Sequence, residues 1–349
     1  MDANSDSDTT YTAAETLEPE AADLDQPELT QAEGLWFEDC GLIIRAENTI
    51  YRVSSAILAM HSVVFRDMLS LPPPDEPDMM DGCPFVLLAD SAEDVTNFLK
   101  AVFHYSFFNP PPAPTTFPII CSVLRMSHKY DVDELRKRAL VHFSQAHPTT
   151  LSEWDAVVST PPSWTKSNDD QNLLSISIAR QFGASWILPT AFYRTCEITR
   201  EDRFINTKHL DTSDKVRFLQ GVRYLETTGA SQMLNFLLDE SLWSNLNCHE
   251  ALEAGQRVCI GSREDDEWRH QIHSDLEERK GFDAHVGAVM PLELWQDEHW
   301  SDLPACDDCT EEIQSALQEA RQKLWNELPT IFGLPDWKEL RKMKADALK

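Results

Sequence analysis

Two short runs of branched residues, followed at once by an amphipathic helical pattern, form the clearest signal in the chain. Residues 42–45 and 50–53 have the composition of strands, and the Glu-Asn pair between them suits a tight turn. Ser54 and Ser55 then offer N-caps for a helix. The apolar residues that follow fall on one broad helical stripe: Ile57, Leu58, Val64, Phe65, Met68 and Leu69. The pattern therefore predicts a hairpin followed by a pair of helices.

The next hundred residues continue this mixture of strand and helix patterns. Residues 83–88 predict a third strand, and three helical patterns follow at 91–105, 117–130 and 131–147. Residues 71–82 contain three consecutive prolines, which exclude both a helix and a central strand, so a loop is predicted there. Residues 109–114 predict a second rigid connection.

Residues 149–349 form a second region in which helical patterns dominate. A loop is predicted at 159–171, and no internal repeat of fixed period is visible. Helices are predicted at 173–182, 190–196, 215–225, 232–238, 265–279, 292–300 and 311–328. Because alternating branched runs are almost absent, the expected architecture of this region is a mostly α-helical domain.

The first 33 residues differ from the rest in composition. They contain ten Asp or Glu and no Lys or Arg, and apolar residues are few. Such a segment buries too little surface to offset the entropy of ordering, so a disordered acidic tail is predicted for 1–33. Leu17, Leu24 and Leu29 among these acids leave open a second interpretation, an acidic activation segment.

The order of patterns between residues 34 and 148 resembles a BTB/POZ domain of the type common in fungal proteins. The resemblance rests on Asp39 before the first predicted strand, on the segment 62–69 (SVVFRDML), and on the later strand and helices in the same order. Residues 188–193 (LPTAFY) and 328–337 (LPTIFGLPDW) resemble segments of the helical region that follows the domain in such proteins. The resemblance implies an α+β fold with a short three-stranded sheet flanked by helices.

Composition restricts the classes of partner and compartment. A net charge of −29 disfavours nucleic acid as a partner, because phosphate binding needs a basic surface. No apolar run is long enough to span a membrane. Eight widely spaced cysteines without a secretory signal indicate reduced thiols, so an intracellular protein of the cytoplasm or nucleus is expected.

Cys306 and Cys309 carry the sharpest local chemistry. Their CxxC spacing allows two thiolates to hold one Zn²⁺, and the other ligands would be chosen from Cys248, His249, Cys259 and His299. No second CxxC exists, so a structural interpretation is preferred, in which Asp308 caps a helix that begins near Glu311. No cofactor is therefore expected, and zinc is kept as an alternative.

The motifs of common enzymes are missing from the sequence, including GxSxG, GxxxxGK[ST], GxGxxG and HExxH. The expected function is therefore protein–protein interaction by an adaptor or scaffold, without catalysis. BTB domains commonly self-associate through their first helix, and some recruit cullin-type ubiquitin ligase scaffolds. One alternative is a substrate adaptor of such a ligase with a metal-stabilised C-terminal domain. Another is an enzyme domain after residue 149.

Specific residues follow from these expectations. Phe65, Leu58 and Met68 share a helical face and are expected in the core, and Asp39 is expected to accept backbone N–H bonds where the first strand begins. The predicted helix pair is apolar over so wide an arc that a second covering surface is expected. The residues assigned to that interaction are Ile57, Leu58, Met60, Val63 and Val64. The cover is expected to be a second copy of the chain in a homodimer, or else the C-terminal domain of the same chain.

Overall fold

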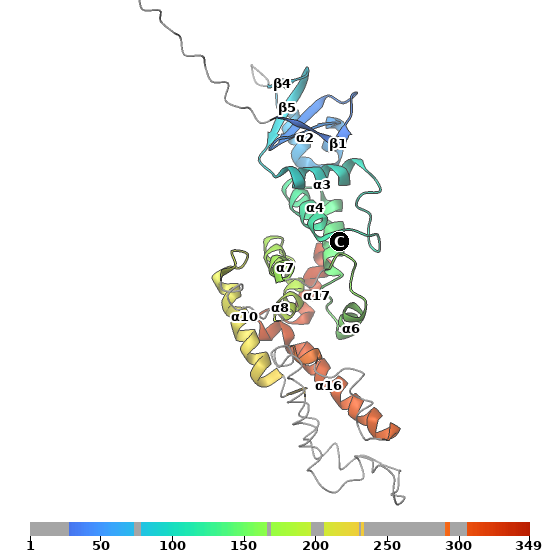
Figure 1. The fold of residues 1–349 in the computed structure, drawn as a ribbon, viewed down its shortest axis with the longest axis vertical. Coiled ribbons are helices and arrows are strands. Elements are labelled where there is room, and N and C mark those ends of the chain that lie inside the picture. The colour runs from blue at the N-terminus through green and yellow to red at the C-terminus, as the bar shows by residue number, and fades with distance from the viewer. Residues whose placement is uncertain are drawn as a thin grey trace, which may run out of the picture.

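The protein is an α+β molecule with a small mixed sheet at one end and helices along the rest of its length (Figure 1). The computed structural model describes residues 28–72, 78–165, 169–196, 206–229, 232–233, 290–293 and 306–349. Within these residues the chain forms five strands and eleven α-helices. None of these helices is both long and apolar enough to cross a membrane.

The sheet has the strand order β1-β3-β2-β5-β4. β2 (Leu42–Ala46) and β3 (Thr49–Val53) form the predicted hairpin, and the predicted third strand is β5 (Cys83–Leu88), which runs parallel to β2. β1 (Thr30–Trp36) pairs parallel to β3, and β4 (Met79–Met80) pairs antiparallel to β5.

Two of these strands correct the sequence-based expectations. The sheet has five strands rather than three, and β1 begins at Thr30, inside the segment 1–33 that was predicted to be a disordered tail. β4 lies inside the segment 71–82, which was expected to be a loop throughout. Both additions are edge strands, whose short pairing with one neighbour leaves little trace in the apolar pattern.

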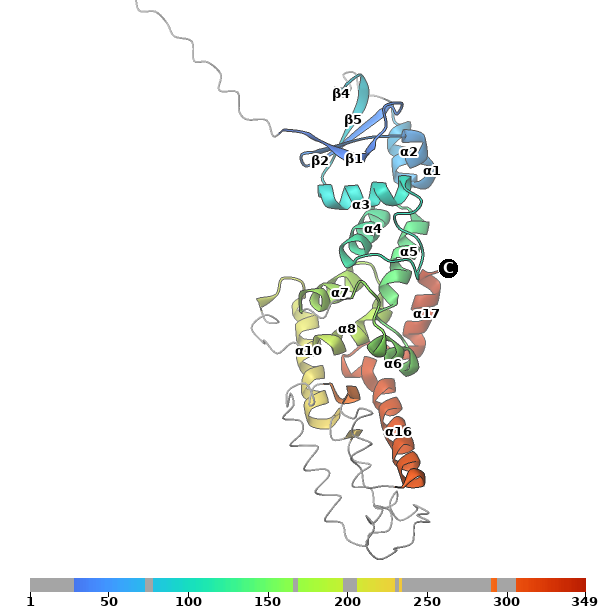
Figure 2. The same cartoon turned by 45° about the vertical axis from the view of Figure 1, so that its right-hand side comes forward.

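Five helices cover the sheet and extend away from it. They are α1 (Ser55–His61), α2 (Val63–Ser70), α3 (Ala92–Phe103), α4 (Phe117–Lys129) and α5 (Asp133–Ser144). Ser54 caps α1 as predicted, because its side chain accepts a hydrogen bond from the N–H of Ile57. Figure 2 shows α3 running across the base of the sheet, with α4 and α5 beneath it.

The sheet meets these helices through alternating apolar positions. Leu42, Ile44 and Val53 are buried in the core. Tyr51 is buried with them, and its hydroxyl donates to the carbonyl of Ala92 over 2.9 Å, at the first turn of α3. This bond fixes α3 against the middle of the sheet, since a buried hydroxyl requires a partner.

The described part of the second region is helical, as expected. Its helices are α6 (Leu151–Ser159), α7 (Asp169–Gln181), α8 (Leu188–Thr195), α10 (Thr212–Tyr224), α16 (Asp307–Ile331) and α17 (Trp337–Ala347). Three short helical segments accompany them: η1 (Ser185–Ile187), η2 (Leu225–Gly229) and η6 (Pro291–Glu293). α6 and α17 were not predicted. The helices predicted at 232–238, 265–279 and 292–300 lie wholly or mostly outside the described residues.

The division expected between residues 148 and 149 falls in packed structure. His147 and Thr149 are both buried. The indole N–H of Trp186 donates to the hydroxyl of Ser144 over 2.9 Å, and Arg341 of α17 donates to the carbonyl of Thr149 over 3.2 Å. One cluster of buried apolar side chains runs from β1 to α17, so the two regions share a core.

Candidate functional site: the α1–α2 surface

The α1–α2 pair is held in place by one serine between the helices. Ser62 ends α1 and begins α2, and its side-chain oxygen accepts a hydrogen bond from the N–H of Phe65 over 3.0 Å. The same hydroxyl donates to the carbonyl oxygen of Tyr130, at the end of α4. The chain turns at this buried residue, so each helix is short. One face of the pair packs on the core and the other faces solvent.

The inner face carries the residues expected in the core. Leu58 and Phe65 are each 1% exposed, and the ring of Phe65 stacks on Tyr130 with centroids 4.6 Å apart. Met68 is only partly buried, at the edge of the same cluster. The burial of Leu58 also corrects its assignment as a contact residue, because a side chain in the core cannot reach a partner.

Four large apolar side chains of the pair are exposed, alongside the exposed His61, Arg66 and Asp67. Ile57, Met60, Val63 and Val64 form what we term the α1–α2 surface, and their exposed fractions run from 37% for Ile57 to 72% for Met60. All four were assigned to an interaction from the sequence. Leu71, which follows α2, is also exposed and was not assigned. The sequence could have indicated this exposure, because Leu71 directly precedes three prolines. The prolines end the helix, so Leu71 does not lie on its buried face.

Hydrogen bonds to Asp90 hold the end of α4, against which the inner face of the α1–α2 pair packs. Asp90 accepts hydrogen bonds from the hydroxyl of Tyr130 and from the ammonium of Lys129, each over 2.7 Å. Burial, together with the neighbouring Asp90 carboxylate, raises the pKa of Tyr130, so the phenol stays protonated and keeps donating. The end of α4, on which Phe65 stacks, is thereby fixed.

Asp39 lies in an exposed turn between β1 and β2. The thiol of Cys40 is 3.9 Å from its carboxylate. Burial raises the pKa of Cys40, and the charge of Asp39 adds to the effect, so this thiol is poorly suited to act as a nucleophile. The expected acceptance of backbone N–H bonds by Asp39 stays a prediction.

A second group of polar side chains lies inside the helical region. The indole N–H of Trp154 donates to Glu293 over 3.1 Å, and burial raises the pKa of this carboxyl group. The hydroxyl of Tyr193 accepts from the N–H of Leu292 over 2.9 Å. Arg321 pairs with Asp155. These bonds tie α6, α8, η6 and α16 together, which is a structural role.

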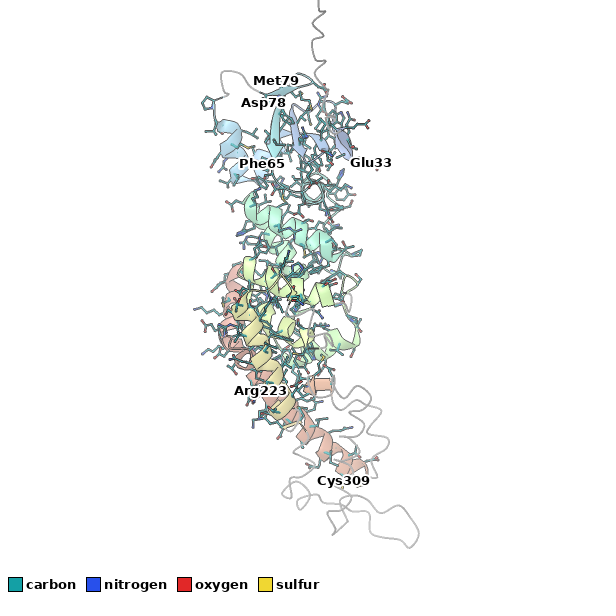
Figure 3. All side chains as sticks on the ribbon, turned by 60° about the vertical axis from the view of Figure 1, so that its left-hand side comes forward. Glu33, Phe65, Asp78, Met79, Arg223 and Cys309 are labelled. Atoms are coloured by element: carbon teal, nitrogen blue, oxygen red, sulfur yellow. The ribbon has the colours of Figure 1, made fainter. Side chains whose placement is uncertain are left out.

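Cys306 and Cys309 lie at the start of α16, at the opposite end of the molecule from Phe65 (Figure 3). The helix begins at Asp307 with Cys306 as its N-cap, so the expectation that Asp308 caps it is wrong. Cys309 is buried. Among the described residues no group of three His, Cys, Asp or Glu is arranged to hold a metal ion. The other proposed ligands, Cys248, His249, Cys259 and His299, lie outside the described residues.

The comparisons with known proteins assign no role to the α1–α2 surface. No protein-family model, no curated protein and no solved structure matches the chain.

Proposed function

We propose that this chain is a protein–protein interaction protein that binds other proteins through the α1–α2 surface. The observation that carries the proposal is the exposure of four large apolar side chains on two consecutive short helices. Single exposed apolar residues are common on proteins, but an apolar group of this kind on one helix pair is typical of an interface. Covering it with a partner removes apolar area from water and stabilises the complex.

The favoured partner is a second copy of the chain in a two-fold pair. The sequence resemblance to BTB/POZ domains supports this choice, since that family commonly self-associates through the first helix. A two-fold contact also places the same apolar side chains against each other, so the surface needs only to complement itself. The same resemblance suggests a cullin-type scaffold as a second protein partner.

The proposal is one of association rather than catalysis. Two of the titratable groups with raised pKa values in the helical region, Glu293 and Tyr193, are buried and hydrogen-bonded to neighbouring elements. Their arrangement supports a structural role in holding η6 against the other helices.

Light scattering of the full chain at micromolar concentration tests the proposal. The wild-type protein is expected at twice the mass of one chain, and Met60→Asp is expected to be monomeric because an aspartate buried in an apolar contact is unpaired. Leu219→Asp is the matched control, since Leu219 is an exposed apolar residue of α10, far along the chain from α1. A wild-type monomer, or equal dissociation by both variants, would contradict the proposal.

A further inference from the structure

Residues of α5, α6 and α17 line a groove of about 890 Å³. Figure 2 shows α6 and α17 well away from α1 and α2. Its apolar lining includes Val141 of α5, Val157 of α6 and Leu348 at the end of α17. Val141 is 38% exposed, although α5 buries Leu140 and His142 on either side of it. The groove therefore offers apolar contact to a segment that lies along it.

Two proline-bearing loops form the walls of this groove. Pro112 comes from the loop before α4, and Pro161 and Pro162 come from the loop after α6. Behind the second loop, the ring of Trp164 is buried and stacks on Phe117 with centroids 5.9 Å apart. Prolines and a buried ring restrict the motion of the walls, so a ligand enters the groove without having to order it first.

The charge of the groove favours an acidic ligand. Lys344 is the basic residue of its lining, and the segment 338–349 to which it belongs has five basic and two acidic residues in a chain of net charge −29. Glu153 also lines the groove, but its carboxylate accepts from the backbone N–H of Thr149 over 3.3 Å. Glu153 keeps its charge and offsets Lys344 within the lining, so the net positive charge beside the groove comes from the other basic residues of α17.

We propose that residues 8–20 of the same chain bind in this groove. The segment DTTYTAAETLEPE has four acidic residues and no basic ones, and it carries two large apolar side chains, Tyr11 and Leu17. The apolar pair matches the lining of Val141, Val157 and Leu348, and the acids match the α17 edge. Pro19 favours an extended backbone, which suits a groove between two rigid loops.

The length of the chain allows this contact. Residue 28 lies two residues before the start of β1. The groove lies at the far end of α5, which is about 18 Å long at 1.5 Å per residue, and α3 adds a helix diameter of about 10 Å. Eleven extended residues between Leu17 and residue 28 span at most about 36 Å, which exceeds the length of α5 and the diameter of α3 added together.

Hydrogen–deuterium exchange of the full chain, read by mass spectrometry, tests the proposal. Amides of residues 8–20 are expected to exchange at least about tenfold more slowly than in an unprotected chain. Two independent variants are expected to abolish this protection: Tyr11→Ser combined with Leu17→Ser in the segment, and Val141→Asp in the groove. Val158→Asp is the matched control, because Val158 is an exposed valine of α6 outside the groove lining and its variant should keep the protection.

The remaining outcomes overturn the proposal. Unprotected exchange in the wild-type chain would show that the segment is not bound. Protection that survives Val141→Asp would place the segment on another surface. Protection that grows with protein concentration would mean that the segment binds a second copy. A synthetic peptide of residues 8–20 gives a direct readout, since it should bind the Tyr11→Ser, Leu17→Ser chain and fail to bind when Val141→Asp is added.

Discussion

A single hydroxyl group at Ser62 serves two purposes in the α1–α2 pair. It caps α2 by accepting from Phe65, and it donates to the carbonyl of Tyr130, so it links local helix formation to the packing of α4. Ser54 caps α1 with a longer bond of 3.4 Å at an exposed position and has no second partner of this kind. The two serines therefore provide a comparison between a cap alone and a cap that also satisfies a buried carbonyl.

Ser62→Ala is expected to lower the free energy of unfolding by about 1–3 kcal/mol, because it removes the cap and leaves buried polar groups without a partner. Ser54→Ala is the control and should cost less than about 1 kcal/mol. Urea denaturation of both variants measures the difference. Equal costs would show that the bond to Tyr130 contributes nothing beyond the cap.

The lowered pKa of His147 makes the free energy of unfolding depend on pH. Burial, with a smaller effect from the charge of Arg194, lowers the pKa of His147 to about 3. The folded state therefore keeps the imidazole neutral, while an unfolded chain protonates it near pH 6.5. Because the unfolded state then binds the additional proton, stability that is present above pH 6.5 is lost as the pH falls toward 3.

Between pH 6 and pH 5, this group should lower the free energy of unfolding by about 1 kcal/mol per pH unit. His147→Gln is expected to reduce the slope by that amount, which denaturation at the two pH values will measure. His142 contributes in the same direction, since burial also lowers its pKa, so some slope should persist. An unchanged slope in His147→Gln would show that His147 is not kept neutral by the fold.

At the scale of elements, the apolar pattern predicted those strands and helices that carry a regular apolar stripe. The hairpin, β5 and the helices from α1 to α5 agree with the sequence to within a few residues. The hairpin strands and α3 to α5 each bury several positions at the expected spacing, whereas α1 and α2 bury only Leu58 and Phe65 and were predicted from their apolar stripe as a whole. The α1–α2 surface could be predicted for the same reason: its apolar residues exceed those needed for one buried stripe.

Elements with a short or irregular apolar pattern were missed. β1 buries only Ala32 and Leu35, three residues apart, because its pairing with β3 is irregular between Gln31 and Trp36. The short α17 buries Trp337 and Leu340, but its many charged residues are typical of an exposed segment, so no helix was predicted there. The groove could not be predicted either, because its walls come from loops and helices that only the tertiary fold brings together.

The start of α16 allows a test of the zinc alternative. Serine is a better N-cap than cysteine, so Cys306→Ser is expected to raise the free energy of unfolding by up to about 1 kcal/mol. Cys309→Ser should lower it by about 1–3 kcal/mol, because the substitution buries a more polar group. Metal analysis of the purified wild-type chain is expected to find no stoichiometric zinc. One zinc per chain, lost in Cys306→Ser together with stability, would contradict these expectations and establish a metal-dependent fold.

At the scale of the whole molecule, charge and apolar surface oppose each other. Each chain carries a net charge of −29, so two chains repel, whereas the α1–α2 surface gains free energy by leaving water. The repulsion acts over the Debye length, which is about 30 Å at 0.01 M salt and about 8 Å at 0.15 M. The apolar contact itself is not screened, so salt should change only the opposing contribution.

Dimerisation through the α1–α2 surface is therefore expected to strengthen with salt. Raising the ionic strength from about 0.02 M to about 0.3 M should lower the dissociation constant of the proposed dimer several-fold, because the Debye length falls by about a factor of four. Sedimentation of the full chain over a concentration series at each salt measures this constant. Met60→Asp should stay monomeric throughout, since screening cannot restore a lost apolar contact. Association that weakens as salt is added would show that ion pairs hold the two chains together, and would exclude this apolar surface as the main source of their affinity.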